Sequence, residues 1–153
     1  MVGMSKRVLF IHGPNFNLLG VREPELYGKE TLSEIIDRIR EYAKQYDIVL
    51  SNIQSNHEGV LIEAIHGARE NEDAIVINAG AFTHYSWAIH DALKMFDGPI
   101  VEVHITDPDE REEFRHVSVI RPVAADVVKG LGTPGYEVAI DKVAELLGAK
   151  RGA

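Results

Sequence analysis

The sequence of 153 residues contains no cysteine. That absence excludes disulfide bonds, thiolate metal sites, iron–sulfur clusters and cysteine nucleophiles. Positive charge is also scarce, since 16 Lys and Arg stand against 24 Asp and Glu and give a net charge of −8. This charge argues against nucleic acid or an anionic membrane as the main partner. No apolar run approaches the ~20 residues that a membrane span needs.

The composition favours one ordinary globular domain. With 45% hydrophobic and 26% charged residues, a chain of this length is predicted to form a single catalytic or binding domain over residues 1–153, with one core. The N-terminal stretch carries the basic residues Lys6 and Arg7, but the apolar run 8–11 after them is too short for a secretory leader. The sequence therefore predicts a cytoplasmic protein.

Short apolar runs alternate with helical patterns along the chain. Runs typical of strands buried on both faces occupy residues 8–11, 48–53, 74–77, 100–105 and 117–120. Amphipathic spacing predicts helices over 31–46, 60–68, 87–96 and 134–147, the first opened by a Thr31–Glu34 capping box. This alternation predicts an α/β fold, a flavodoxin-like three-layer sandwich with a five-stranded parallel sheet.

Polar side chains follow three of the predicted strands. Asn15 comes after the first strand, Asn78 and His84 come after the third, and His104 stands near the end of the fourth. Ligands bind at the carboxyl ends of the strands in an open parallel sheet, so these residues predict a small polar pocket. The alternative is that each Asn or His only caps a helix or fills a turn.

The longest irregular stretch, residues 13–30, follows the first predicted strand and contains Arg22 and Tyr27. Loops of this length in a compact domain are commonly lids or binding loops. A guanidinium group near a phenol favours the phenolate, which makes Arg22 and Tyr27 a candidate catalytic pair. Surface packing is the alternative for both residues.

Three other patterns predict less. Gly130-Leu131-Gly132-Thr133-Pro134-Gly135 has the dinucleotide fingerprint, but no strand–helix–strand unit follows it, so it is interpreted as a helix-entry turn. His57-Glu58 lacks the second His of a zinc protease motif, and the seven histidines do not cluster at ligand spacing, so no metal is predicted. The run 109–113 is interpreted as a solvated helical turn, with Arg115 beyond it within reach of the pocket.

A series of motifs runs in order along nearly the whole chain. It comprises Gly13-Pro14-Asn15-Phe16-Asn17-Leu18-Leu19-Gly20, Arg22-Glu23-Pro24, Tyr27-Gly28, Gln54-Ser55-Asn56-His57-Glu58-Gly59, Asn78-Ala79-Gly80-Ala81, Thr83-His84, Ala88-Ile89-His90-Asp91-Ala92-Leu93, Glu102-Val103-His104, Arg111-Glu112-Glu113-Phe114-Arg115-His116, Gly130-Leu131-Gly132 and Gly135-Tyr136. In this order and spacing, the series resembles the type II 3-dehydroquinate dehydratases.

The resemblance implies a reaction and the roles of five residues in it. The reaction is dehydration of 3-dehydroquinate to 3-dehydroshikimate through an enolate, without metal, cofactor or Schiff base. Tyr27 is implied to be the base that removes the proton α to the ketone, and Arg22 its activating partner. His104 is implied to protonate the departing hydroxyl, with Glu102 as an orienting neighbour. Asn15 is implied to help stabilise the enolate, through a bound water.

The resemblance also implies the substrate-binding residues and the assembly. The binding positions are Asn78, His84, Asp91, Ile105, Thr106 and Arg115. The assembly is a homododecamer of trimers, in which Asp91 reaches a neighbouring subunit's site. The sequence departs from the family pattern at Thr106-Asp107, where Ser-Asn is usual, and at Tyr85 and Trp87, which replace smaller residues. We expect Asp107 to alter carboxylate affinity, and Tyr85 and Trp87 to affect subunit packing.

Two other classes share the predicted fold. A flavin-binding module has a phosphate loop rich in Ser and Thr after its first strand, and Gly13-Pro14-Asn15 is not such a loop. A signalling receiver domain needs acidic residues after the first strand and an Asp after the third, where Asn15 and Asn78 stand here. Bound flavin would favour the first class and acyl-phosphate labelling the second. The sequence leaves open a role in aromatic biosynthesis or in quinate breakdown.

Overall fold

The computed structural model describes residues 4–152. Five strands form one fully parallel sheet in the order β2-β1-β3-β4-β5. The strands are β1 (Lys6–His12), β2 (Ile48–Gln54), β3 (Ala74–Asn78), β4 (Ile100–Val103) and β5 (Asp126–Val128). This order is that of the flavodoxin-like doubly wound fold. The fold class predicted from the sequence is confirmed.

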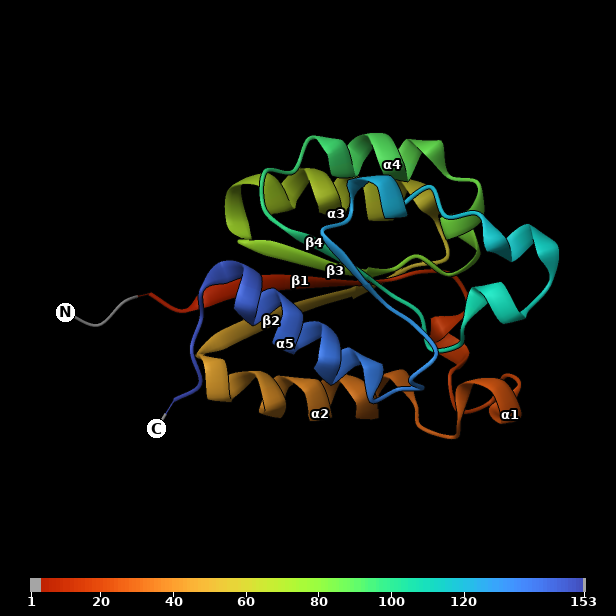
Figure 1. Cartoon of the computed structure of the whole chain (residues 1–153), viewed down its shortest axis with the longest axis horizontal. Coiled ribbons are helices and arrows are strands. Elements are labelled where there is room, and N and C mark those ends of the chain that lie inside the picture. The colour runs from red at the N-terminus through yellow and green to blue at the C-terminus, as the bar shows by residue number, and fades with distance from the viewer. Residues whose placement is uncertain (1–3, 153) are drawn as a thin grey trace.

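Helices cover both faces of the sheet and give three layers (Figure 1). Helices α2 (Leu32–Ala43) and α5 (Gly135–Leu147) pack on one face, and α3 (Glu58–Asn71) and α4 (Trp87–Lys94) pack on the other. Successive β1 side chains point to opposite faces of the sheet. Val8 and Phe10 pack in the core on the α2 and α5 side, and Leu9 and Ile11 pack in the core on the α3 and α4 side. Among the helices of residues 4–152, none is long and apolar enough to cross a membrane.

The start of α2 follows the sequence prediction. The Thr31 hydroxyl accepts a hydrogen bond from the Glu34 N–H at 3.2 Å, and the Glu34 carboxylate accepts one from the Thr31 N–H at 3.3 Å. These two bonds make the capping box that the Thr-x-x-Glu spacing predicts. They fix the point at which the irregular segment before α2 ends and the helix begins.

The prediction of a strand over residues 117–120 is wrong. The fifth strand is β5, which pairs with β4. The Val119 N–H donates instead to the Thr83 carbonyl at 2.8 Å, and the Val119 carbonyl contacts His90 Nδ1 at 2.6 Å. Val119 and Ile120 are buried against the α3 and α4 side of the sheet. Burial explains their apolar character, while their backbone partners lie outside the sheet.

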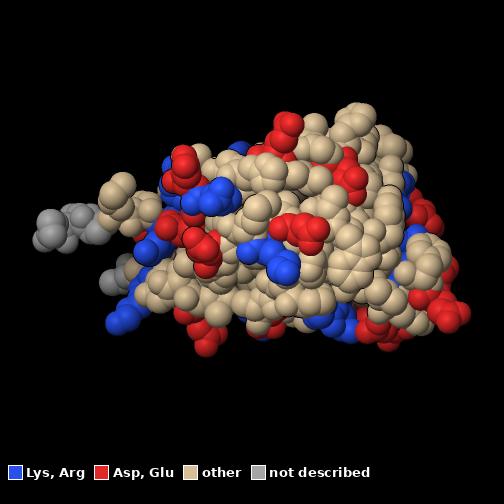
Figure 2. Space-filling view, turned by 90° about the horizontal axis from the view of Figure 1, so that it is seen from above, with Lys and Arg blue, Asp and Glu red and all other residues tan. Residues whose placement is uncertain are grey.

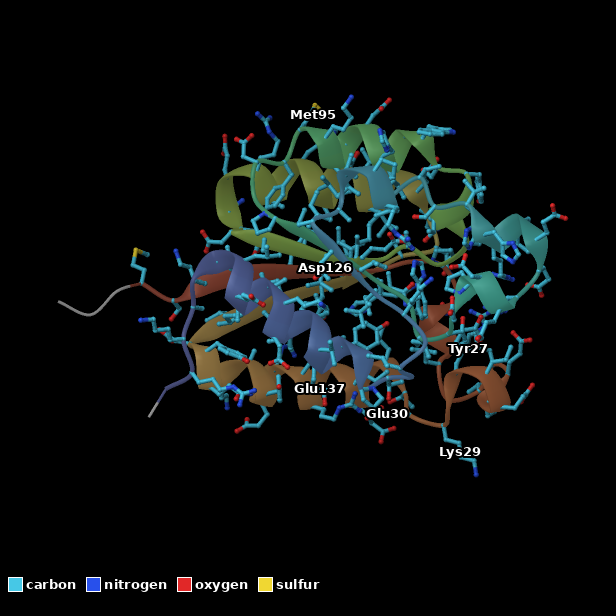
Figure 3. The ribbon with its side chains drawn as sticks, in the orientation of Figure 1. Tyr27, Lys29, Glu30, Met95, Asp126 and Glu137 are labelled. Carbon is cyan, nitrogen blue, oxygen red and sulfur yellow. The ribbon has the colours of Figure 1, made fainter. Side chains whose placement is uncertain are left out.

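The segment between β1 and α2 contains two short helices within the predicted loop, η1 (Phe16–Leu18) and α1 (Pro24–Tyr27). We call residues 20–30 the lid. Arg38 of α2 pairs with Glu30 at the end of the lid and with Glu137 of α5 at 3.0 Å. Figure 3 shows Glu30 and Glu137 close together where the two helices begin. This ion-pair cluster fixes the lid's end to the helical layer.

Short 3-10 turns make up most of the remaining connections. They are η2 (Lys44–Tyr46), η3 (Gly80–His84), η4 (Pro108–Glu110), η5 (Glu113–His116) and η6 (Arg121–Val123). Turns η3, η4 and η5 follow β3 and β4 at their carboxyl ends. They therefore lie at the edge of the sheet where the sequence predicts the pocket.

Candidate active site

A small cavity of about 100 Å³ opens at the carboxyl ends of β1, β3 and β4. The residues that line it are Pro14, Asn15, Phe16, Arg22, Tyr27, Asn78, Gly80, Ala81, His84, His104, Ile105, Thr106, Pro108, Arg111 and Arg115. Within the described part of the chain, this lining contains three arginines and no Asp, Glu or Lys. The lining therefore suits an anionic ligand with several hydroxyl groups.

The turn after β1 brings Asn15 to the cavity. The Gly13 N–H donates to the Asn78 carbonyl at 2.8 Å, and a Cβ at Gly13 would lie only 2.3 Å from the Ala79 oxygen. Only glycine permits this approach of the β1 and β3 ends. Asn15 then adopts a left-handed conformation with φ 73°, and its N–H donates to Asn56 Oδ1 at 2.8 Å. The side chain of Asn15 is left exposed at the cavity.

Asn78, the last residue of β3, is fixed from both ends of its amide. Its Oδ1 accepts from the Gly80 N–H at 3.2 Å, and its Nδ2 donates to the Tyr136 hydroxyl at 3.1 Å. Burial raises the pKa of Tyr136 to about 12, so this phenol is neutral at physiological pH. A flipped amide would set Nδ2 against the Gly80 N–H, and the orientation of Asn78 in the cavity is therefore determined.

Tyr27 lies at the end of α1 with Arg22 against its ring. The Arg22 guanidinium carbon is 4.3 Å from the ring centroid, and Nη2 donates to the Tyr27 oxygen at 3.4 Å. The same Nη2 is 3.4 Å from a Glu23 carboxylate oxygen, so Arg22 is shared between two acceptors. Figure 3 shows Tyr27 beside the turns that follow β4. The lid thus brings this phenol, 7% exposed, to the cavity.

Arg111 lies closer to the Tyr27 hydroxyl oxygen than Arg22 does. Its Nη1 donates to the Tyr27 oxygen at 2.8 Å and contacts the Thr106 hydroxyl at 3.4 Å. The interpretation of residues 109–113 as a solvated turn is wrong for Arg111, whose side chain is only 15% exposed. The sequence offers no local signal for this contact, because Arg111 stands within a run of charged residues.

His104 and Glu102 form a buried pair at the end of β4. His104 Nε2 lies 2.5 Å from Glu102 Oε2, and their side chains are 8% and 1% exposed. Burial by itself raises the pKa of Glu102, but the contacts with His104, Ser118 and Arg121 outweigh it and hold the pKa below its ordinary value. The carboxylate accepts a hydrogen bond from Nε2–H and so orients the imidazole ring. The side chain of His104 also lines the cavity, and its other nitrogen, Nδ1, is not used in the contact with Glu102.

The remaining predicted binding residues lie around these two groups. His84 Nδ1 contacts the Val117 carbonyl at 2.7 Å, and burial holds the pKa of His84 below its ordinary value. Arg115 Nε donates to Glu112 at 2.5 Å. Ile105 and Thr106 form the cavity wall after β4. The structure thus brings together every predicted site residue except Asp91, which is exposed on α4 and does not line the cavity.

Asp107 turns away from the cavity. Its carboxylate accepts from the Asp109 N–H at 3.0 Å and lies 3.5 Å from Lys129 Nζ. Asp107 does not line the cavity, so its negative charge is compensated elsewhere. Across residues 4–152, the structure contains no group of three or more acidic or imidazole side chains that could hold a metal ion.

Comparison with known proteins assigns the family. The family model described as dehydroquinase class II matches residues 6–144. The chain belongs to the class II dehydroquinases.

Relatives of this family match most of the chain. A catabolic 3-dehydroquinase of Phaeosphaeria nodorum is 52% identical over 92% of this chain and 93% of its own length. A 3-dehydroquinate dehydratase of Bacillus licheniformis is 50% identical over 87% of this chain and 92% of its own. The crystal structure of a type II dehydroquinase from Butyrivibrio crossotus has a TM-score of 0.89 and 47% identity, and the match covers 92% of this chain and 99% of that one. The resemblance found in the sequence is confirmed.

Membership of the class II dehydroquinases gives the cavity a chemical context. The motifs that carry the resemblance supply 12 of the 15 lining residues, all except Ile105, Thr106 and Pro108.

Proposed function

We propose that this class II dehydroquinase is a 3-dehydroquinate dehydratase, a lyase that eliminates water from 3-dehydroquinate and forms 3-dehydroshikimate. The arrangement of two proton-transfer groups in one cavity supports the proposal best. A phenol contacted by two guanidinium groups and an imidazole held by a carboxylate both line it. The reaction is a step of the shikimate pathway of aromatic amino acid biosynthesis.

Tyr27 is the proposed base. A cation beside a phenolate stabilises its negative charge, and Arg22 and Arg111 both reach the Tyr27 oxygen. The phenolate takes the proton α to the ketone, and the electron pair of that C–H bond forms the enolate. Asn15, which lines the cavity, helps stabilise the enolate oxygen through a bound water.

His104 is the proposed acid. With Nε2 held by Glu102, Nδ1 of this cavity-lining imidazole is the nitrogen left to carry the transferred proton. The enolate collapses, the bond to the departing hydroxyl breaks, and Nδ1–H supplies the proton that converts the hydroxyl into water. Two oppositely charged environments thus serve the two proton transfers of one elimination.

Substrate binding falls to the remaining polar residues of the cavity. Asn78 and His84 are placed to contact hydroxyl groups, and Arg115 adds positive charge. The Ile105 and Thr106 backbone with the Thr106 hydroxyl suits the substrate carboxylate, because N–H and O–H donors bind carboxylates well. The net charge of −8 does not oppose this binding, because donors in the cavity determine the local field.

The proposed reaction needs neither metal nor a Schiff base. An imine mechanism requires a desolvated lysine in the cavity, and no lysine lines it in the part of the chain that the structure describes. We expect borohydride added with substrate to leave activity intact and to add no mass, and chelators to have no effect. Covalent trapping at any lysine would contradict this mechanism.

A second subunit is proposed to complete the site with Asp91, within trimers that assemble into a dodecamer. Asp91 follows Trp87 by four residues on α4 and so shares its helix face. Trp87 and Tyr85 are 59% and 61% exposed, and large exposed apolar residues favour an interface. Figure 2, seen from the α4 side, shows acidic and basic side chains interspersed with uncharged surface, so charge repulsion does not oppose association there.

Mixed oligomers test the role of Asp91. Tyr27→Phe and Asp91→Asn chains are each expected to be nearly inactive alone. Refolded together in equal amounts, about a quarter of random pairings unite an intact Tyr27 with an intact Asp91, and activity reappears. A mixture that stays inactive while mixed oligomers form would place Asp91 outside a shared site.

The activity itself is tested with the purified chain and 3-dehydroquinate. The product contains a conjugated enone, so ultraviolet absorbance is expected to rise with time. No rise would contradict the proposed function, and bound flavin in the purified protein would favour a flavin-binding module instead. Residues 1–153 are proposed to form one catalytic domain. The cytoplasmic location stays a prediction, which fractionation of the source cells tests.

A further inference from the structure

The Glu102 carboxylate has partners on both oxygens, and only His104 belongs to the proposed reaction. Oε2 also accepts from the Ser118 hydroxyl at 2.8 Å, and Oε1 accepts from Arg121 Nε at 3.2 Å. The Arg121 side chain is 47% exposed while Glu102 is 1% exposed. A guanidinium at the surface therefore reaches inward to a carboxylate enclosed by the sheet.

Ser118 and Arg121 form one structural unit. The Ser118 oxygen accepts hydrogen bonds from the Ile120 N–H at 3.2 Å and from the Arg121 N–H at 3.1 Å, while its hydroxyl donates to Glu102. The same atom thus caps the start of η6 and contacts the carboxylate. This turn fixes the Arg121 backbone at a constant position relative to Glu102.

Neither residue lines the cavity, so neither contacts a ligand there. A buried carboxylate is stable only when its charge and lone pairs are compensated. Three charged or titratable groups act on Glu102. They are His104, two residues further along the chain, Arg121 on η6 and His84 on η3. Of these, Arg121 alone carries its charge at every physiological pH.

We propose that Arg121, held by the Ser118 turn, is a positioning residue for proton delivery: it keeps Glu102 ionised and directed at His104. This inference rests on the proposed function and adds a residue that acts through Glu102 rather than on the substrate. Without Arg121, Oε1 loses its partner and the carboxylate is free to rotate away from His104 Nε2. Proton delivery by Nδ1 is then less well oriented, while the cavity walls stay unchanged.

The test compares Arg121→Gln with Arg121→Lys and with a control, Lys142→Gln. Lys142 forms a surface ion pair with Asp126 at 2.9 Å, outside the cavity. We expect Arg121→Gln to lower kcat about fivefold, a partly exposed pair contributing that much, with KM unchanged. Arg121→Lys keeps the charge and recovers most of kcat, and Lys142→Gln matches the parent.

Two pH measurements distinguish positioning from general destabilisation. The contact with Arg121 is one cause of the lowered pKa of Glu102, so its removal moves that pKa back toward the ordinary value. The acid limb of kcat therefore moves to higher pH in Arg121→Gln. The ¹³C carboxyl resonance of Glu102, followed without substrate, moves its midpoint in the same direction.

The outcomes separate this inference from the proposed function. If the parent chain forms no enone, the proposed function fails, and the carboxyl titration still decides whether Arg121 holds Glu102 ionised. If the parent is active and Arg121→Gln keeps its kcat, acid limb and titration midpoint, the inference is overturned. A lower melting temperature with an unshifted acid limb also overturns it, because Arg121 is then only structural.

Discussion

The two halves of the cavity are built in different ways. The sheet half consists of three side chains buried at strand ends, those of Asn78, Glu102 and His104. Each is held by a hydrogen bond to another buried side chain, and Asn78 also by the backbone N–H of the turn after β3. In the lid half, Tyr27 depends on side-chain contacts with Arg22 and Arg111, of which Arg22 is 24% exposed. The lid contributes no strand to the sheet. We therefore expect substitutions in the sheet half to reduce both turnover and the free energy of unfolding, and substitutions in the lid half to reduce mainly turnover.

The two halves also carry opposite charges around the two groups proposed to transfer protons. Cations surround the Tyr27 oxygen, and an anion contacts the His104 imidazole. The proposed base and the proposed acid therefore lie in oppositely charged surroundings within one cavity. This polarity is the feature that suits an elimination, in which one proton is taken and another is given.

The largest expected effect comes from the phenol in the lid half. Tyr27→Phe keeps the ring and removes one oxygen, so kcat is expected to fall by ~10²–10⁴-fold, the contribution of a positioned acid or base. Because the ring still packs against Arg22, the fold is kept, and the melting temperature is expected to fall by only about 2–4 °C, the shift that the loss of one hydrogen bond of about 1 kcal/mol produces in a domain of this size. Near-normal turnover would exclude Tyr27 as the base.

Arg111 is expected to matter more than Arg22. A hydrogen bond to a charged group contributes about 1.5–3 kcal/mol, so Arg111→Gln lowers kcat by roughly 10- to 150-fold. Arg22→Gln has a smaller effect, because its 3.4 Å contact is shared with Glu23 while the Arg111 contact is 2.8 Å. Steady-state kinetics of both variants check this order, and a larger loss for Arg22→Gln would reverse our account of the lid.

The sheet itself is expected to make the free energy of unfolding sensitive to acid, through His12, the buried last residue of β1. Burial lowers the pKa of His12 from 6.5 to about 4, so between these values the unfolded chain binds a proton that the folded chain does not. The free energy of unfolding therefore falls as pH drops from 6.5 to 4, by about 3 kcal/mol in total. Urea unfolding at several pH values checks this dependence.

His12→Asn removes that titration, so its stability is expected to fall less across the same window. His66→Asn is the matched control, because His66 is exposed on α3, and it keeps the parental slope. If His12→Asn retained the full parental slope, the acid sensitivity would come from other groups.

The smallest effect is expected at Asp107. Its carboxylate pairs with Lys129 and does not line the cavity, so Asp107→Asn is expected to change KM for 3-dehydroquinate by less than about twofold, within the range of surface substitutions. A larger decrease in KM would mean that the Asp107 charge reaches the substrate carboxylate.

The sheet half could be predicted from the sequence because its signals are local. Strand ends follow from the apolar runs, and Asn78 and His104 stand directly at them. Residues 117–120 misled the prediction because apolar character reports burial, whereas a strand also needs sheet partners for its N–H and C=O groups. Val119 finds those partners in Thr83 and His90 instead.

The lid half was less accessible to sequence reasoning. Arg22 and Tyr27 are five residues apart, so their pairing could be suspected, but Arg111 is 84 positions from Tyr27. Nothing in the charged run 109–113 distinguishes an arginine that turns inward from its solvated neighbours. The same holds for Arg121, whose contact with Glu102 depends on the course of the chain after η5.

The assignment of Tyr27 as the base and His104 as the acid is tested most directly by hydrogen exchange in D₂O. His104→Gln retains the base but lacks the acid, so 3-dehydroquinate recovered from it is predicted to carry deuterium at the carbon α to the ketone, with little product formed. Substrate recovered from Tyr27→Phe is predicted to carry none above the no-enzyme control. Deuterium incorporation by Tyr27→Phe, or its absence with His104→Gln, would contradict the assignment of base and acid.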